Sequence, residues 1–278
     1  MQMPRIIYGT AWKKDQTADL VTRAITAGFR GIDTAGQPKH YNEAGVGEAL
    51  QKLATQGITR EQLFIQTKFT SISGQDPTRM PYDPSAPLAT QVAQSFSSSL
   101  KNLGTTYVDS LVLHSPLGNW NQMTEVWTAM EAICSQGGAK IIGISNCYDL
   151  DILKAVYDHA TIKPRVLQNR FYPETSYDTD LRLWCADKDI TYQSFWTLTG
   201  NPHILDNPKV HQIAKARQKT EAQIFFRFLT QIGIVPLTGT RSDLHMKQDL
   251  EIFEFDLSQG AMEIIQEVTF GFRRVKQA

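Results

Sequence analysis

The chain repeats one pattern along its length: a short apolar, β-branched segment, a polar turn, and then a segment with helical spacing. The apolar segments are nearly continuous, which is typical of strands that are buried on both faces of a parallel sheet. Eight such segments are found, and the predicted strands span residues 6–8, 31–33, 63–68, 108–114, 141–145, 166–168, 191–195 and 232–237.

The segments between these strands have the spacing of amphipathic helices. Val92, Phe96, Leu100 and Leu103, for example, lie on one helical face. The predicted helices span residues 17–27, 43–56, 88–103, 123–136, 149–159, 178–188, 208–217, 220–231, 243–252 and 258–268.

Alternation of eight strands with helices predicts a closed parallel (β/α)8 TIM barrel. Such a barrel commonly uses about 250 residues in one unit, and no Pro/Gly/Ser-rich linker divides the chain, so we expect one domain over residues 1–278. A doubly wound open sheet is the alternative, but it would need a glycine-rich phosphate turn, and no G-x-G-x-x-G occurs. The longest irregular segment, residues 70–87, is expected to be a functional loop.

Charge and cysteine content limit the classes of partner. The 28 basic and 28 acidic residues cancel, which leaves no footprint for nucleic acid or an anionic membrane. Cys134, Cys147 and Cys185 are widely spaced, so neither a metal site nor a disulfide framework is indicated. No apolar run has the length of a signal peptide or a membrane helix. We therefore expect a cytoplasmic protein, and a monomer is sufficient.

Four side chains that can carry proton chemistry follow the second, third and fourth predicted strands. They are Asp33, Tyr41, Lys68 and His114. The carboxyl ends of barrel strands meet at one face, where barrel enzymes have their active sites. Each residue alone has an ordinary explanation: a capping carboxylate, a packed tyrosine, a lysine that reaches the barrel rim, or a core histidine.

Together the four residues suggest reduction of a carbonyl group. A lysine beside a tyrosine lowers the pKa of the phenol, and a carboxylate keeps a buried lysine charged. The imidazole can orient the carbonyl oxygen, which the tyrosine then protonates as a general acid. These groups supply no electrons, so the arrangement implies a hydride from a nicotinamide cofactor.

Further residues at strand ends suit such a cofactor. Ser145, Asn146 and Gln168 could bind a carboxamide, and Phe195 or Trp196 could stack on a planar ring. After the last strand, hydroxyls and backbone N–H groups at a helix start suit a phosphate, with basic residues nearby. The candidates in this segment are Thr238, Gly239, Thr240, Arg241 and His245. Each group could equally serve loop structure or packing.

Seven stretches in the expected order resemble the aldo-keto reductases over nearly the whole chain. They are Gly-Thr-Ala-Trp at 9–12, Gly-Phe-Arg-Gly-Ile-Asp-Thr-Ala at 28–35, Tyr-Asn-Glu at 41–43, Gln-Thr-Lys at 66–68, Asp-Ser-Leu-Val-Leu-His-Ser-Pro at 109–116, Ile-Gly-Ile-Ser-Asn at 142–146 and Gln-Asn at 168–169.

The resemblance implies a (β/α)8 barrel and NADPH-dependent reduction of a small aldehyde or ketone. It also implies a catalytic tetrad of Asp33, Tyr41, Lys68 and His114, with Tyr41 as the acid. The expected cofactor contacts are Thr10, Trp12, Asp33, Ser145, Asn146, Gln168, Phe195, Leu198, Thr238, Gly239, Thr240, Arg241 and His245, and the expected substrate contacts are Trp12, Tyr41, His114 and Trp120.

The chain departs from the family pattern at two positions. Tyr41 lies eight residues after Asp33, whereas the family usually has five, and His40 is an alternative neighbour. Leu237 replaces a lysine that many members use for the adenosine 2′-phosphate, so NADH stays an alternative to NADPH.

Two other functions fit the same residues. One is a regulatory subunit that binds the cofactor with little turnover. The other is a barrel enzyme that uses Lys68 as a Schiff-base nucleophile.

Overall fold

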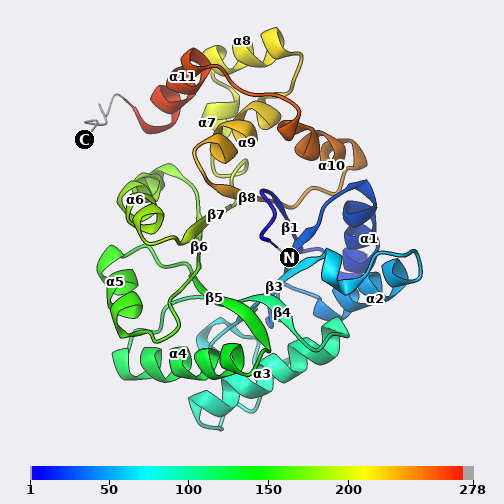
Figure 1. The fold of residues 1–278 in the computed structure, drawn as a ribbon, viewed down its shortest axis with the longest axis vertical. Coiled ribbons are helices and arrows are strands. Elements are labelled where there is room, and N and C mark those ends of the chain that lie inside the picture. The colour runs from blue at the N-terminus through cyan, green and yellow to red at the C-terminus, as the bar shows by residue number, and fades with distance from the viewer. Residues whose placement is uncertain (1, 272–278) are drawn as a thin grey trace.

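The computed structural model describes residues 2–271, which form one closed parallel barrel (Figure 1). Each strand pairs with the next, and β8 pairs with β1 through Ile7↔Leu237 and Tyr8↔Thr238. This closure confirms the predicted barrel and excludes the open sheet. The strands are β1 (Ile7–Gly9), β2 (Gly31–Asp33), β3 (Phe64–Phe69), β4 (Val108–Leu113), β5 (Ala139–Ser145), β6 (Val166–Arg170), β7 (Thr191–Phe195) and β8 (Val235–Thr238).

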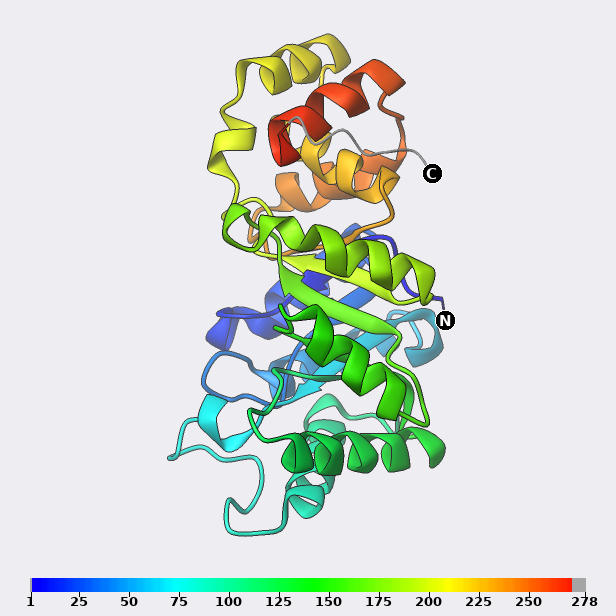
Figure 2. The same ribbon diagram turned by 90° about the vertical axis from the view of Figure 1, so that its left-hand side faces the viewer.

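Helices surround the strands, and the last five lie together beyond β7 and β8 at one side of the barrel (Figure 2). The four-residue α7 was not predicted, because one turn is too short to show a helical period. The helices are α1 (Thr17–Ala27), α2 (Glu43–Ala54), α3 (Leu88–Leu103), α4 (Trp120–Ser135), α5 (Leu150–His159), α6 (Thr179–Asp187), α7 (Pro202–Leu205), α8 (Pro208–Arg217), α9 (Glu221–Gln231), α10 (Asp243–Leu250) and α11 (Gln259–Phe270).

Most element boundaries differ from the sequence prediction by one to three residues, and three of the differences bear on the cap, turn and site geometry. Helix α4 begins at Trp120, because the Asn119 side chain caps it by accepting from the Gln122 N–H. Strand β8 begins at Val235, because Gly233 has φ +82° and forms the turn that ends α9. Strand β6 continues to Arg170, which carries that side chain to the functional face.

The inside of the barrel has an apolar part and a polar part. Ile7, Phe64 and Leu237 form the apolar cluster. Gln66, Gln168 and Gln193 join one another and Asp33 through side-chain hydrogen bonds. The polar part therefore supports the site from below. No helix within residues 2–271 has both the length and the apolar character needed to cross a membrane.

Candidate active site

A cavity of about 1260 Å³ lies against the carboxyl ends of the strands. This exceeds the roughly 300–1,000 Å³ that is typical of a pocket for one small ligand. Residues at or just beyond the ends of most strands line it, including Gly9, Asp33, His114, Ser145, Gln168, Phe195 and Thr238. Its size is sufficient for a long cofactor together with a small substrate.

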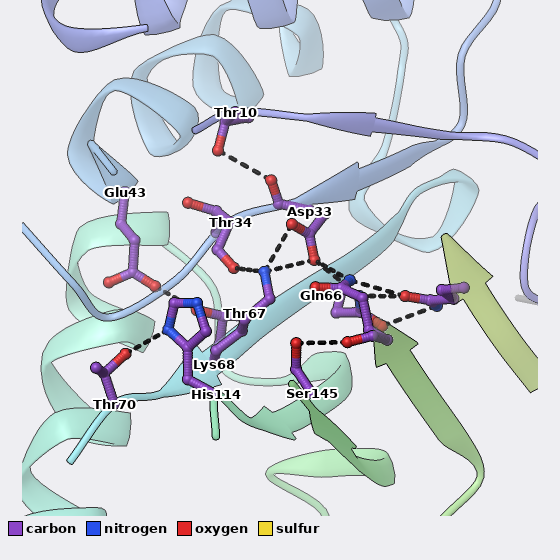
Figure 3. Close-up of polar contacts among 12 residues, drawn as sticks. Thr10, Asp33, Thr34, Glu43, Gln66, Thr67, Lys68, Thr70, His114 and Ser145 are labelled. Carbon is purple, nitrogen blue, oxygen red and sulfur yellow. Dashed lines mark hydrogen bonds and ion pairs between the residues drawn. The ribbon is translucent and has the colours of Figure 1, made fainter. Parts of the chain in front are cut away.

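Lys68 and Asp33 form a buried ion pair at the floor of this cavity (Figure 3). The Lys68 Nζ lies 2.7 and 2.6 Å from the two carboxylate oxygens of Asp33 and 2.9 Å from the Thr34 carbonyl oxygen. These three acceptors occupy all three ammonium protons. Burial lowers the pKa of Lys68, and the Asp33 carboxylate opposes that change.

Two amides hold Asp33 in place from within the barrel. Gln66 Nε2 and Gln168 Nε2 donate to Asp33 Oδ1 at 2.8 and 3.0 Å, and both also donate to the amide oxygen of Gln193. The carboxylate is thus fixed by an ammonium and by two amides.

Tyr41 reaches the site despite the longer loop that precedes it. Its ring centroid lies 5.9 Å from that of His114 and 5.1 Å from the Lys68 Nζ. The Tyr41 and His40 N–H groups both donate to the Gln37 carbonyl oxygen, so the extra residues form a compact turn. The structure therefore brings all four expected residues together.

The pKa of Tyr41 changes in the opposite direction to the one that the sequence analysis predicts. Burial raises the pKa of the Tyr41 phenol above its ordinary value, and the negative charge of Asp33 acts in the same direction. We expected Lys68 to lower this pKa. The ammonium instead directs its protons to Asp33 and Thr34, so desolvation of the phenol is the larger effect.

His114 is held as a neutral imidazole. Its Nδ1 lies 2.6 Å from the Thr70 hydroxyl oxygen, and its backbone N–H donates to the Phe69 carbonyl oxygen. Burial lowers the pKa of His114 to about 3, and the charges of Lys68 and His40 act in the same direction. The ring is therefore uncharged at neutral pH.

The expected carboxamide and ring-stacking residues share one wall of the cavity. Ser145 Oγ donates to the Gln168 carbonyl oxygen at 2.6 Å, and Asn146 Nδ2 donates to the His114 carbonyl oxygen at 2.8 Å. Asn146 has φ 52°, in the left-handed region. Phe195 and Leu198 line the same cavity.

Four expected site residues do not line the cavity. Lys68 is buried and pairs with Asp33, which does line it. Thr10 is fully buried, and its hydroxyl donates to the Asp33 carbonyl oxygen. Arg241 is absent from the cavity lining, and its side chain donates to the Trp12 carbonyl oxygen at 2.8 Å. Trp120 is the first residue of α4 and is 44% exposed there. Trp12, Thr238, Gly239, Thr240 and His245 do line the cavity.

Lys13 is a site residue that the sequence reasoning missed. It is buried on the cavity wall, and its Nζ donates to the Gly239 carbonyl oxygen in the turn after β8. Burial lowers the pKa of Lys13 to about 8, and the charge of Arg241 acts in the same direction. The sequence shows two adjacent lysines after Trp12, Lys13 and Lys14, but it does not indicate that Lys13 is buried in the site and Lys14 is exposed.

His40 and Arg170 also line the cavity and were not among the expected site residues. The His40 ring packs on Trp12 with centroids 3.8 Å apart. Trp12 itself has φ 61°, a conformation that is uncommon for a bulky residue and is often found at functional sites. Within residues 2–271, no group of three or more His, Cys, Asp or Glu side chains could hold a metal ion.

Comparisons with known proteins agree with this geometry. Residues 5–201 match the model of the aldo/keto reductase family. A glyoxal reductase of Bacillus subtilis is 30% identical over 252 residues, which cover 90% of this chain and 83% of that protein. A morphine 6-dehydrogenase of Pseudomonas putida is 28% identical over 291 residues, covering 98% and 90%.

Solved structures of aldo-keto reductases also superpose on nearly the whole chain. An aldo-keto reductase from a Medee basin deep-sea metagenome library superposes with a TM-score of 0.82 at 27% identity, over 98% of this chain and 93% of that one. An aldo/keto reductase from Brucella melitensis superposes with a TM-score of 0.79 at 28% identity, over 96% and 95% of the chains.

Proposed function

Because this chain belongs to the aldo/keto reductase family of oxidoreductases, we propose that it reduces a small aldehyde or ketone to an alcohol, with NADPH as the hydride donor. The observation that carries the proposal is the buried Lys68–Asp33 pair, which lies beside Tyr41 and His114 on the floor of one large cavity.

Tyr41 delivers the proton to the carbonyl oxygen in this proposal. Its raised pKa keeps the phenol protonated at neutral pH, so the proton is available when the oxygen gains negative charge. The Lys68 ammonium, 5.1 Å from the ring centroid, stabilises the phenolate that remains. Asp33 keeps that ammonium charged despite its burial.

His114 orients the substrate oxygen. We assign the neutral tautomer in which the Thr70 hydroxyl donates to Nδ1 and the proton resides on Nε2. The Nε2–H group can then donate to the carbonyl oxygen. A neutral donor suits this role, because the low pKa of His114 prevents the ring from competing with Tyr41 as the acid.

The cavity residues fit a dinucleotide. Ser145, Asn146 and Gln168 would hold the carboxamide, and Phe195 would face the nicotinamide ring. When bound, this cofactor supplies the hydride.

At the other end of the cofactor, Lys13, His245 and the turn Thr238–Thr240 would hold the phosphates. Leu237 belongs to the apolar barrel interior with Ile7 and Phe64 and offers no charge. We therefore propose that Lys13 supplies the positive charge that a lysine at the position of Leu237 supplies in many family members.

The test is the loss of NADPH absorbance with a panel of aldehydes and ketones. Tyr41→Phe should lower kcat by roughly 100-fold or more, which is the usual contribution of a positioned general acid. Tyr157→Phe, on α5 and outside the cavity, is the matched control and should behave as wild type.

Two outcomes would contradict the proposal. Equal turnover by Tyr41→Phe would remove the acid role from Tyr41. Tight binding of NADPH without turnover of any carbonyl would favour a regulatory subunit instead.

A further inference from the structure

Arg170 places a permanent positive charge on the cavity wall, and no carboxylate within the described residues pairs with it. It forms none of the ion pairs found within residues 2–271. Its Nε is buried and has no hydrogen-bond partner there. Two other shielded cations, Lys68 and Arg60, are paired with Asp33 and Asp109.

Aromatic rings hold the guanidinium in place. Its central carbon lies 4.3 Å from the ring centroid of Trp196, 5.3 Å from that of Tyr172 and 6.0 Å from that of Phe195. These contacts stabilise a cation, but they accept none of the directed hydrogen bonds that the edge of a guanidinium can donate. The group is therefore positioned and still has donors to offer.

Arg170 lies close to the proposed reaction centre. It follows Gln168 by two residues on β6 and pairs in register with Phe195 of β7. Its backbone N–H donates to the Tyr148 hydroxyl at 3.1 Å, and that hydroxyl donates to Asn146 Oδ1 at 3.3 Å. Asn146 in turn donates to the His114 carbonyl oxygen. A short polar chain thus joins Arg170 to the residue that orients the substrate.

We propose that Arg170 binds a carboxylate of the substrate, so the preferred substrates are aldehydes or ketones that also carry a carboxylate. This inference rests on the proposed carbonyl reductase function. A guanidinium fork matches a carboxylate through two parallel N–H···O bonds, which are charge-assisted and strong. Trp196 lines the same cavity and is 46% exposed, so its flat ring could pack against a flat spacer between the two groups.

Two substrates of similar shape isolate the charge: 4-carboxybenzaldehyde and 4-methylbenzaldehyde. Wild type should have the higher kcat/KM for the carboxylated aldehyde. In Arg170→Gln, the ratio of the two kcat/KM values should fall roughly 10- to 100-fold, as expected for loss of a charge-assisted hydrogen-bond pair. Arg170→Lys keeps the charge but not the fork and should give an intermediate ratio.

Arg165→Gln is the matched control. Arg165 precedes the first residue of the same strand, at the opposite end of the barrel, and pairs with Asp189 on the surface. It should leave the ratio unchanged. A second readout needs no turnover: binding of 4-(hydroxymethyl)benzoate, followed by tryptophan fluorescence, should weaken in Arg170→Gln by a similar factor.

The outcomes separate the two proposals. If Arg170→Gln leaves both the ratio of the two kcat/KM values and the binding of 4-(hydroxymethyl)benzoate unchanged, the carboxylate site is wrong and the proposed carbonyl reduction is unaffected. A loss of NADPH affinity with an unchanged ratio would assign Arg170 to the cofactor and also overturn it. Arg170-dependent benzoate binding in an enzyme that reduces no carbonyl would support the site and reject the proposed function.

Discussion

Desolvation sets the proton affinity of three groups in the site. It raises the pKa of Tyr41, lowers that of His114 to about 3 and lowers that of Lys13 to about 8. In each case burial is a larger influence than any neighbouring charge, because the charged form loses its hydration. Burial thus favours the neutral form of all three groups, which suits an acid at Tyr41 and an uncharged donor at His114.

Lys13 gives the residue-scale prediction. With a pKa of about 8 the ammonium is charged below that pH and loses its proton above it. Affinity for NADPH should therefore fall as the pH rises from 7 to 9. Lys13→Met should weaken binding at pH 7 by roughly tenfold, as for the loss of a hydrogen bond to a charged group, and should flatten this pH dependence.

The control for Lys13 is its neighbour. Lys14→Met removes an equal charge from an exposed position and should retain both the affinity and its pH dependence. Dissociation constants from tryptophan fluorescence at several pH values would decide. Wild-type affinity in Lys13→Met at pH 7 would contradict the assignment of this lysine to a phosphate.

At the scale of elements, the close contact of α2 with α3 depends on one glycine. A Cβ added to Gly47 in α2 would lie 2.1 Å from the Asn102 carbonyl oxygen in α3. That atom belongs to helix backbone and cannot move aside as a flexible side chain can. Helix α2 begins just after Tyr41 and carries Glu43, which accepts from the Thr67 and Ser99 hydroxyls. This packing therefore supports the floor of the site.

Gly47→Ala should lower the free energy of unfolding by about 1–3 kcal/mol, because the added methyl group overpacks the interface. Gly260→Ala is the matched control, since that helical glycine has no atom within 4 Å of an added Cβ. It should stabilise by about 0.4–1 kcal/mol through the lower entropy of the unfolded chain. Urea denaturation of both variants would test this, and equal stabilities would contradict the close contact.

At the scale of the whole molecule, barrel closure depends on the last quarter of the chain. Residues 5–201 match the family model, yet β8 (Val235–Thr238) lies beyond them. That strand pairs with both β7 and β1. It also contributes Thr238 to the cavity, while the following turn contributes Gly239 and Thr240. We therefore propose that the barrel and its C-terminal helices form one folding unit.

A chain that ends at Asn201 should not fold cooperatively. It would leave β1 and β7 as open edges. It would also expose apolar surface that α9 covers in the full chain, such as the fully buried ring of Phe171, which packs on Phe225. Thermal unfolding followed by circular dichroism should show no sharp transition, whereas the full chain should show one. A cooperative transition in the shorter chain would mean that residues 202–278 form a separate unit.

The repeated strand–helix units, and the positions of Asp33, Lys68 and His114 at strand ends, could be predicted from the sequence alone. Strand and helix periods are local properties, and parallel strands in a closed barrel bring their carboxyl ends to one face. Tyr41 could be predicted as well, because its loop returns to the same face through local backbone hydrogen bonds.

The side chains that face the cavity, and the charges that are neutralised, could be identified only from the folded structure. Lys13 lies on the cavity wall and Lys14 is exposed. Thr10 and Arg241 each donate a hydrogen bond to a backbone carbonyl oxygen and do not line the cavity. Arg170 forms no ion pair within residues 2–271, and its Nε has no hydrogen-bond partner there. Whether a carboxylate lies beside it depends on how distant parts of the chain fold together. Burial and counter-ions arise from long-range contacts, and a local sequence pattern does not specify these contacts.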